Sequence, residues 1–211
     1  MKRVYFVDFD GTITKKDTTD AIVSSFARDG WQEIMRLWNE GKLSTEQSAR
    51  LILPYLQVSS EEAARFLREI PIDDTFRDFL TYVKARDEQC YILSDGFDFN
   101  ISTVLEKAGI THLPVYTNQL IIGENSYDIA CPHASPCGHC GTCKKTLVKK
   151  LSKEADQAVY IGDGYSDHCG CQAADLIFAK GFLLRYCRAQ KIPARPFRTF
   201  ADIVKYLENL A

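Results

Sequence analysis

The chain begins with a short, almost wholly apolar segment, Arg3 to Val7, which predicts a fully buried strand. From about residue 14 to residue 72 the pattern changes, and apolar residues recur at spacings of three and four. This spacing predicts three or four amphipathic helices. Ser44 and Gln47 have the separation of a capping box, which is typical of the first turn of a helix. We therefore expect an all-helical insertion behind the first strand.

Strand-like and helix-like patterns alternate along the rest of the chain. We expect strands at 90–93, 158–161 and 176–179, two or three short strands between 115 and 129 with a turn at 123–126, and helices at 75–86, 97–108, 144–153, 165–174 and 200–210. Such alternation predicts an α/β fold, a parallel sheet with helices on both faces. Residues 1–13 and 73–211 would form the core domain, and residues 14–72 a helical cap domain.

Three of the predicted strands are followed by polar segments that contain glycine, at residues 8–12, 94–96 and 162–167. Because the carboxyl ends of parallel strands meet at one edge of a sheet, we expect these segments to lie together and to bind the ligand. They contribute four carboxylates, from Asp8, Asp10, Asp163 and Asp167. Carboxylates that lie so near one another need a counter-cation, and their oxygens favour Mg²⁺. The pattern therefore predicts a magnesium-dependent phosphoryl site, although a single Asp-Gly pair is more often only a turn.

The charge balance limits the partners. With 26 lysines and arginines against 28 aspartates and glutamates, the formal net charge is −2, which gives no basic field for nucleic acid or an anionic membrane. No apolar stretch approaches the roughly 20 residues that cross a bilayer, and the first residues do not resemble a signal peptide. We expect a cytoplasmic protein, a monomer or homodimer, that binds a small phosphorylated metabolite.

The same segments resemble the motifs of the haloacid dehalogenase (HAD) superfamily of phosphatases. Residues 8–14 are similar to its first motif, residues 94–96 to its second, Lys144 to its third, and residues 162–167 to its fourth. The resemblance implies a Rossmannoid parallel sheet flanked by helices. A helical-bundle cap inserted after the first motif is the arrangement of the phosphoserine-phosphatase-like branch. Ser166 is a departure, since many relatives have Asn at this position.

The resemblance also implies residue roles. Asp8 would be the nucleophile that forms an aspartyl-phosphate, and Asp10 the general acid and base. The phosphate would be bound by Ser94, Asp95, Gly96 and Lys144. Mg²⁺ would be bound by Asp8, the backbone carbonyl of Asp10 and Asp163, with Asp167 as a ligand or a partner of the ligands.

In the cap, the resemblance points to the end of the substrate that does not react. Asp17 occupies the acidic position that faces a substrate ammonium in phosphoserine phosphatases. The arginine that grips the substrate carboxylate in those enzymes is replaced here by Ile52, two positions after Arg50. An apolar residue suits an uncharged ligand end, whereas an alignment shifted by one turn would make Arg50 the carboxylate ligand.

A cysteine-rich loop precedes Lys144 and contains Cys131, Cys137, Cys140 and Cys143. The spacing is compatible with structural Zn²⁺, with a disulfide or free thiols, and less well with an iron–sulfur cluster. Both this loop and the segment 179–187 resemble the methionine-salvage phosphatases that act on 2-hydroxy-3-keto-5-methylthiopentenyl-1-phosphate. Phosphoserine or another small metabolite is the alternative substrate. The alternative of another class is a binding protein with a zinc loop on a catalytically dead scaffold.

Overall fold

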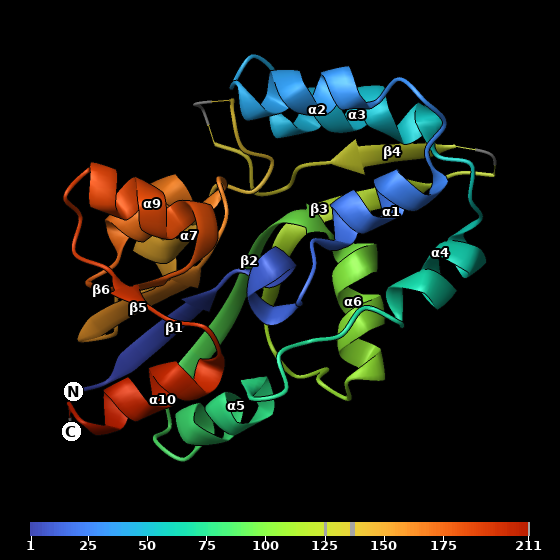
Figure 1. Cartoon of the computed structure of the whole chain (residues 1–211). Coiled ribbons are helices and arrows are strands. Elements are labelled where there is room, and N and C mark those ends of the chain that lie inside the picture. Colours follow the sequence, from blue (N-terminus) through green and yellow to red (C-terminus); the bar gives the residue numbers. More distant parts are fainter. Residues whose placement is uncertain (125, 136–137, 211) are drawn as a thin grey trace. The chain divides into compact units, whose positions relative to one another are not determined.

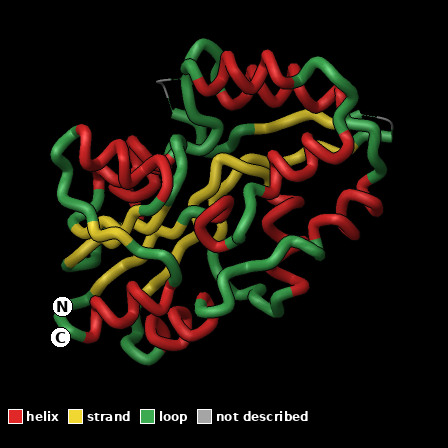
Figure 2. Tube along the Cα trace, viewed as in Figure 1, coloured by secondary structure: helices red, strands yellow, loops and turns green. Residues whose placement is uncertain are grey.

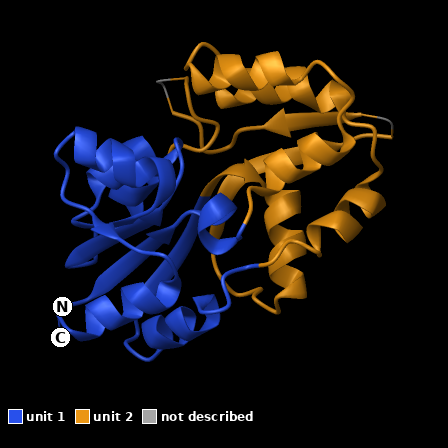
Figure 3. Ribbon diagram, viewed as in Figure 1, with its two compact units in different colours: residues 1–15, 72–93, 144–211 blue, residues 16–71, 94–143 orange. Residues whose placement is uncertain are grey.

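The computed structural model describes residues 1–124, 126–135 and 138–210. The chain divides into two compact units, each made of segments far apart in the sequence (Figure 3). Unit 1 comprises residues 1–15, 72–93 and 144–211, and unit 2 comprises residues 16–71 and 94–143. The assignment of residues 14–72 alone to a cap stays a prediction.

Unit 1 is built on parallel strands that are buried on both faces. In β1 (Arg3–Val7) every residue is buried, and β1 pairs in parallel with β2 (Gln89–Phe97) and with β5 (Gln157–Gly162). The parallel pairing continues to β6 (Leu176–Ala179) and β7 (Arg195–Pro196). Near-continuous apolar strands need a cover on each face, since no solvated side remains.

Helices supply that cover in unit 1 (Figure 1). α5 (Phe76–Lys84) packs against α10 (Phe200–Glu208) through aromatic rings, with Phe76 and Phe200 4.7 Å apart between ring centroids. The remaining helices are α7 (Lys144–Leu151), α8 (Asp167–Gly170) and α9 (Gly181–Ala189). α7 and α8 are in contact, which places the first residue of α7 near the segment that follows β5.

Unit 2 combines helices with an antiparallel pair of strands. Its helices are α1 (Thr18–Phe26), α2 (Gln32–Asn39), α3 (Thr45–Ile52), α4 (Ser60–Leu67) and α6 (Asp98–Lys107). The strands β3 (Val115–Ile122) and β4 (Tyr127–Ala130) pair antiparallel. The capping box predicted at Ser44 is confirmed, because the Ser44 hydroxyl accepts from the Gln47 N–H, and the Gln47 side chain accepts from the Ser44 N–H.

The described strands, drawn in yellow in Figure 2, form one mostly parallel sheet with the order β4-β3-β2-β1-β5-β6-β7. β2 contributes residues to both units. The predicted fold class, a parallel sheet flanked by helices, is confirmed. Two local predictions were wrong. β2 continues through residues 94–96 to Phe97, where a turn was expected, and a single helix at 165–174 is replaced by α8 and the short 3₁₀ turn Cys171–Ala173. The turn expected at 123–126 includes Asn125, which lies outside the described residues.

Candidate active site

The chain turns sharply after β1, and this turn fixes Asp8. The Asp8 N–H donates to the Ile161 carbonyl at 2.9 Å, which extends the ladder with β5 by one residue. Gly11 has a φ of +73°, a conformation that residues with a Cβ rarely adopt. A Cβ at Gly11 would also lie 2.6 Å from Oδ2 of Asp163. The glycine therefore lets the turn approach the Asp163 carboxylate closely.

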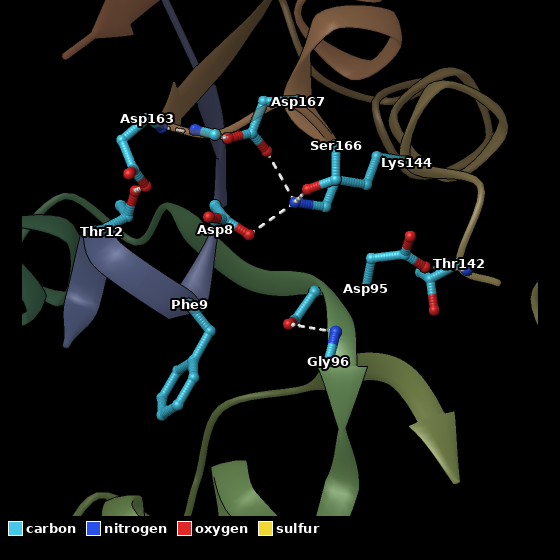
Figure 4. A network of polar contacts seen from close by, with 12 residues as sticks. Asp8, Phe9, Thr12, Asp95, Gly96, Thr142, Lys144, Asp163, Ser166 and Asp167 are labelled. Carbon is cyan, nitrogen blue, oxygen red and sulfur yellow. Dashed lines mark hydrogen bonds and ion pairs between the residues drawn. The ribbon is translucent and has the colours of Figure 1, made fainter. Parts of the chain in front are cut away.

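Lys144, the first residue of α7, points its ammonium group at three oxygens (Figure 4). Its Nζ lies 2.5 Å from Oδ1 of Asp8, 2.6 Å from Oδ1 of Asp167 and 3.0 Å from Oγ of Ser166. An ammonium group has three protons, so these acceptors use all of them. The lysine is only 2% exposed, and burial without such partners would be costly.

The segment after β5 contributes two further carboxylates. Oδ2 of Asp167 accepts the backbone N–H groups of Asp163 and Gly164, at 3.0 and 2.9 Å, and thereby closes the turn. Oδ1 of Asp163 accepts the Thr12 hydroxyl at 2.6 Å, which connects this turn to the one after β1 (Figure 4). The two turns are thus joined through side chains.

The charges in this cluster do not cancel. Burial, followed by the negative charge of Asp167, raises the pKa of Asp8 well above its ordinary value, and Lys144 offsets only part of this. Burial also raises the pKa of Asp163, although the hydrogen bond from Thr12 opposes the change. For Lys144, burial lowers the pKa, but the charges of Asp167 and Asp8 outweigh it and the pKa is raised. The lysine therefore stays cationic in an environment with excess negative charge.

A cation would correct this imbalance. Among the described residues, the group of acidic, histidine and cysteine side chains that could bind a metal ion comprises Asp8, Asp163 and Asp167, whose ligand atoms lie within 4.8 Å of one another. Asp10, which follows Asp8 by two positions in the turn, is not part of this group. Three carboxylates with only one lysine fit a hard divalent cation such as Mg²⁺.

Comparison with known proteins identifies the class of this site. Residues 3–192 match the model of a family described as "Putative Phosphatase". The chain belongs to this phosphatase family. It is 30% identical to the 2-hydroxy-3-keto-5-methylthiopentenyl-1-phosphate phosphatase of Bacillus cytotoxicus, over 97% of this chain and 95% of that protein. The Bacillus cereus protein of the same name is 31% identical, with the same shares covered.

Solved structures agree with the fold. A phospho-aspartyl intermediate analogue of phosphoserine phosphatase superposes with a TM-score of 0.74 at 23% identity, covering 97% of this chain and 98% of that one. The predicted membership of a phosphatase family is confirmed, and so is the predicted likeness to the fold of phosphoserine phosphatase. The protein is a phosphatase, a phosphoric monoester hydrolase, as the motifs indicated. None of the helices in the described ranges is long and apolar enough to cross a membrane.

The second motif of this phosphatase lies in unit 2. Ser94 is buried, and its Oγ accepts the Gly96 N–H at 3.0 Å. The Asp95 carboxylate accepts the Thr142 N–H at 2.7 Å and the Thr45 hydroxyl at 2.5 Å. The side chain of Asp95 thus connects strand, helix and loop inside unit 2. Phosphate binding by Asp95 stays a prediction. It would involve the backbone N–H of Asp95, because the carboxylate repels phosphate.

The predicted substrate residues of the cap have different environments. The Asp17 carboxylate accepts the Asp20 N–H at 2.8 Å and caps α1. Arg50 is half-exposed and pairs with Asp128 and Glu46, and it also donates to the Ile129 carbonyl. Ile52 is buried, 7% exposed. Arg50 therefore connects α3 to β4 through its guanidinium group.

Backbone hydrogen bonds help to hold the cysteine loop. The Cys143 N–H donates to the His133 carbonyl at 2.9 Å, and the Thr45 N–H to the His139 carbonyl at 3.0 Å. Burial, followed by the carboxylates of Glu46 and Asp95, raises the pKa of the Cys131 thiol to about 11. Cys137, one of the predicted ligands, lies outside the described residues. Zinc in this loop stays a prediction.

Several residues that the motifs did not single out take part in the cluster of unit 1. Ser166, noted only as a departure from the family, accepts a hydrogen bond from Lys144. Thr12 joins the two turns through Asp163. Tyr160, a fully buried residue of β5, donates its hydroxyl to Oδ1 of Asp167 at 2.7 Å. The sequence signals only that residue 160 lies in a buried strand.

Proposed function

We propose that this phosphatase hydrolyses 2-hydroxy-3-keto-5-methylthiopentenyl-1-phosphate through a phosphoenzyme formed on Asp8. The observation that carries the proposal is the environment of Asp8. Its carboxylate is buried at the end of β1, bonded to the ammonium of Lys144, and within 4.8 Å of ligand atoms of Asp163 and Asp167. With Lys144 and a bound cation beside it to offset the raised pKa, the Asp8 carboxylate is suited to attack on a phosphate ester.

The reaction proceeds in two displacements. In the first, an Asp8 oxygen bonds to phosphorus while the bond from phosphorus to the ester oxygen breaks, and Asp10 gives its proton to the leaving oxygen. In the second, Asp10 takes a proton from a water molecule whose oxygen bonds to phosphorus. The bond from Asp8 to phosphorus then breaks, which releases inorganic phosphate and restores both carboxyl groups. Lys144 stabilises the negative charge on the transferred group in both steps.

We assign the cofactor as Mg²⁺, bound by Asp8, Asp163 and the backbone carbonyl of Asp10. When bound, it neutralises charge on the phosphate oxygens and the nucleophile. Both oxygens of Asp167 already accept two hydrogen bonds each, a number that fills a carboxylate. We therefore favour an indirect role for Asp167. It would orient Lys144 and the turn at Asp163 rather than bind the metal ion directly.

The substrate assignment rests on the relatives and on the cap. The curated relatives that match over nearly their full length carry the name of the methionine-salvage phosphatase. Arg50, the alternative ligand for a substrate carboxylate, is occupied by Asp128 and Glu46 within unit 2. An unpaired, desolvated carboxylate costs several kcal/mol, so we expect substrates with an uncharged end to be preferred.

Steady-state kinetics test this assignment. We expect kcat/KM for the methionine-salvage enol phosphate to exceed that for O-phosphoserine by at least about a hundredfold, the equivalent of about 2.7 kcal/mol. p-Nitrophenyl phosphate, assayed with and without Mg²⁺, reports phosphatase activity apart from substrate choice. Efficient phosphoserine turnover that collapses in Arg50→Ala would contradict the substrate assignment and leave the phosphatase class intact.

A further inference from the structure

Among the described residues, Asp167 accepts more hydrogen bonds than any other side chain of the polar cluster in unit 1, which is formed by Asp8, Lys144, Asp163, Ser166 and Asp167. Its Oδ2 is occupied by the N–H groups of Asp163 and Gly164. Its Oδ1 is shared by two donors, the Lys144 ammonium at 2.6 Å and the Tyr160 hydroxyl at 2.7 Å. Lys144 in turn is shared between Asp167 and Asp8. The position of the ammonium therefore depends on how strongly Oδ1 of Asp167 attracts it.

The Tyr160 hydroxyl is fixed in its role as a donor. The residue is 0% exposed, and burial, followed by the charges of Asp167 and Asp8, raises its pKa well above the ordinary value. The hydroxyl keeps its proton and donates a hydrogen bond to Oδ1 of Asp167. The ring is also fixed, because a Cβ at Gly170 of α8 would lie 2.8 Å from Cε2 of Tyr160 and 2.9 Å from Cβ of Lys144. The tyrosine ring and the lysine stem thus occupy adjoining space against α8.

We propose that Tyr160 is a positioning residue for catalysis, whose hydroxyl offsets part of the Asp167 charge and so keeps the Lys144 ammonium beside Asp8. It contacts neither substrate nor phosphate, and it acts only through Asp167 and Lys144. The inference rests on the proposed roles of Asp8 and Lys144. It extends the site to a strand residue outside all four motifs.

The physical reason is competition for one oxygen. A hydrogen bond from a neutral hydroxyl withdraws negative charge from Oδ1 of Asp167 and uses one of its lone pairs. Without that bond, Oδ1 attracts the ammonium more strongly, and Lys144 shifts away from Asp8. The attacking oxygen and the transferred phosphoryl group then lose stabilisation, mainly in the transition state, where charge moves between them.

The first test replaces Tyr160 with phenylalanine, which keeps the ring and removes only the hydroxyl. We expect kcat on p-nitrophenyl phosphate to fall about tenfold, with KM changed less than about twofold, because an interaction confined to the transition state appears in kcat. The matched control is Tyr5→Phe. Tyr5 is also 0% exposed and donates its hydroxyl to a carboxylate, Glu88, but it has no described bond to Lys144 or Asp167. The control should keep kcat within about twofold.

The second test separates positioning from support of the fold. Ser166→Ala removes the neutral partner of Lys144, whereas Tyr160→Phe changes its charged partner Asp167, so both changes act on the same ammonium. We expect the double variant to lose at least about fivefold more kcat than the product of the single losses, whereas Tyr5→Phe combined with Ser166→Ala should be multiplicative. Wild-type kcat in Tyr160→Phe, or multiplicative losses with Ser166→Ala, would overturn the inference.

Asp8→Asn, assayed in parallel, separates this inference from the proposed function. An active Asp8→Asn variant would refute the proposed nucleophile. An inactive Asp8→Asn variant together with an unchanged Tyr160→Phe variant would refute only the role of Tyr160. Melting temperatures of all variants show whether a loss of kcat accompanies a loss of folded protein.

Discussion

Two aspartates, one in each unit, accept several hydrogen bonds inside the protein, but from different kinds of donor. In unit 1, Asp167 accepts from a lysine ammonium, a tyrosine hydroxyl and two backbone N–H groups. In unit 2, Asp95 accepts from the Thr45 hydroxyl, the Thr142 N–H and the Asn118 amide.

The difference shows two uses of one side chain. Around Asp167 the bonds orient a buried cation, and that cation can follow charge that develops during a reaction. The described bonds around Asp95 come from neutral groups, which join β2, α3 and the cysteine loop within unit 2 and fix their geometry. We therefore expect changes in the first network to reduce catalysis and changes in the second to reduce stability.

The largest effect should come from the nucleophile itself. Asp8→Asn keeps the size of the side chain but replaces the attacking carboxylate with an amide, and we expect kcat to fall by at least about a thousandfold. Burst and steady-state assays with p-nitrophenyl phosphate measure this. A variant that keeps more than about a tenth of wild-type activity would show that Asp8 is not the nucleophile.

Removal of divalent cations should have the next largest effect. The excess negative charge around Asp8 predicts that EDTA lowers activity by at least about a hundredfold and that added Mg²⁺ restores it. EDTA should also lower the melting temperature, because a bound cation stabilises the folded state. Elemental analysis of the purified protein before chelation also tests whether it contains the zinc predicted for the cysteine loop. Full activity after exhaustive chelation would contradict the assigned cofactor.

Asp95→Ala tests the other side of the comparison. It leaves the Thr142 N–H and the Thr45 hydroxyl without an acceptor, so we expect the free energy of unfolding to fall by about 2 kcal/mol. Urea denaturation followed by circular dichroism measures the change. Asp29→Ala, at an exposed aspartate of the same unit, is the control and should change it by less than about 0.5 kcal/mol. Equal stability of the two variants would mean that the Asp95 bonds do not hold unit 2 together.

The smallest effect is expected at the surface of the cap. Arg50→Ala breaks exposed ion pairs, which contribute little, and should change kcat/KM for the methionine-salvage substrate by less than about twofold. Arg36→Ala, which breaks exposed pairs with Glu33 of α2 and with Glu40 just after the helix, is the matched control. A loss specific to Arg50→Ala would make this arginine part of substrate binding.

The sequence predicted the parts of this molecule that follow from local pattern. The apolar run of β1 and the acidic turn behind it, with Asp8 at the junction, were predicted because a strand that ends in an Asp-Gly turn has few other interpretations. The start of α3 was predicted from Ser44 and Gln47, whose side chains exchange bonds with the backbone within one turn. The order of the motifs along the chain was enough to indicate the superfamily.

Other features depend on partners distant in the sequence and could not be predicted. The pairing of Arg50 with Asp128 joins residues 78 positions apart, and no local pattern signals it. Tyr160 lies in a strand that is buried on both faces, so the alternation that usually tells one face from the other is absent. Residues 94–96 looked like a turn because of Asp and Gly, yet they continue β2, since pairing within the sheet outweighs the local preference.

The three hydrogen bonds that surround the Lys144 ammonium have a consequence for its reactivity toward reagents. An amine attacks acylating or alkylating compounds only through the lone pair of its neutral form. Burial lowers the pKa of Lys144, but the charges of Asp167 and Asp8 outweigh burial and raise the pKa, so the neutral form is rare. Lys149 and Lys150, on the same helix, are exposed. Amine-reactive labels applied to the folded protein should therefore modify these two lysines and spare Lys144. Peptide mass spectrometry would measure this as label on Lys149 and Lys150 and unmodified Lys144 in the same helix.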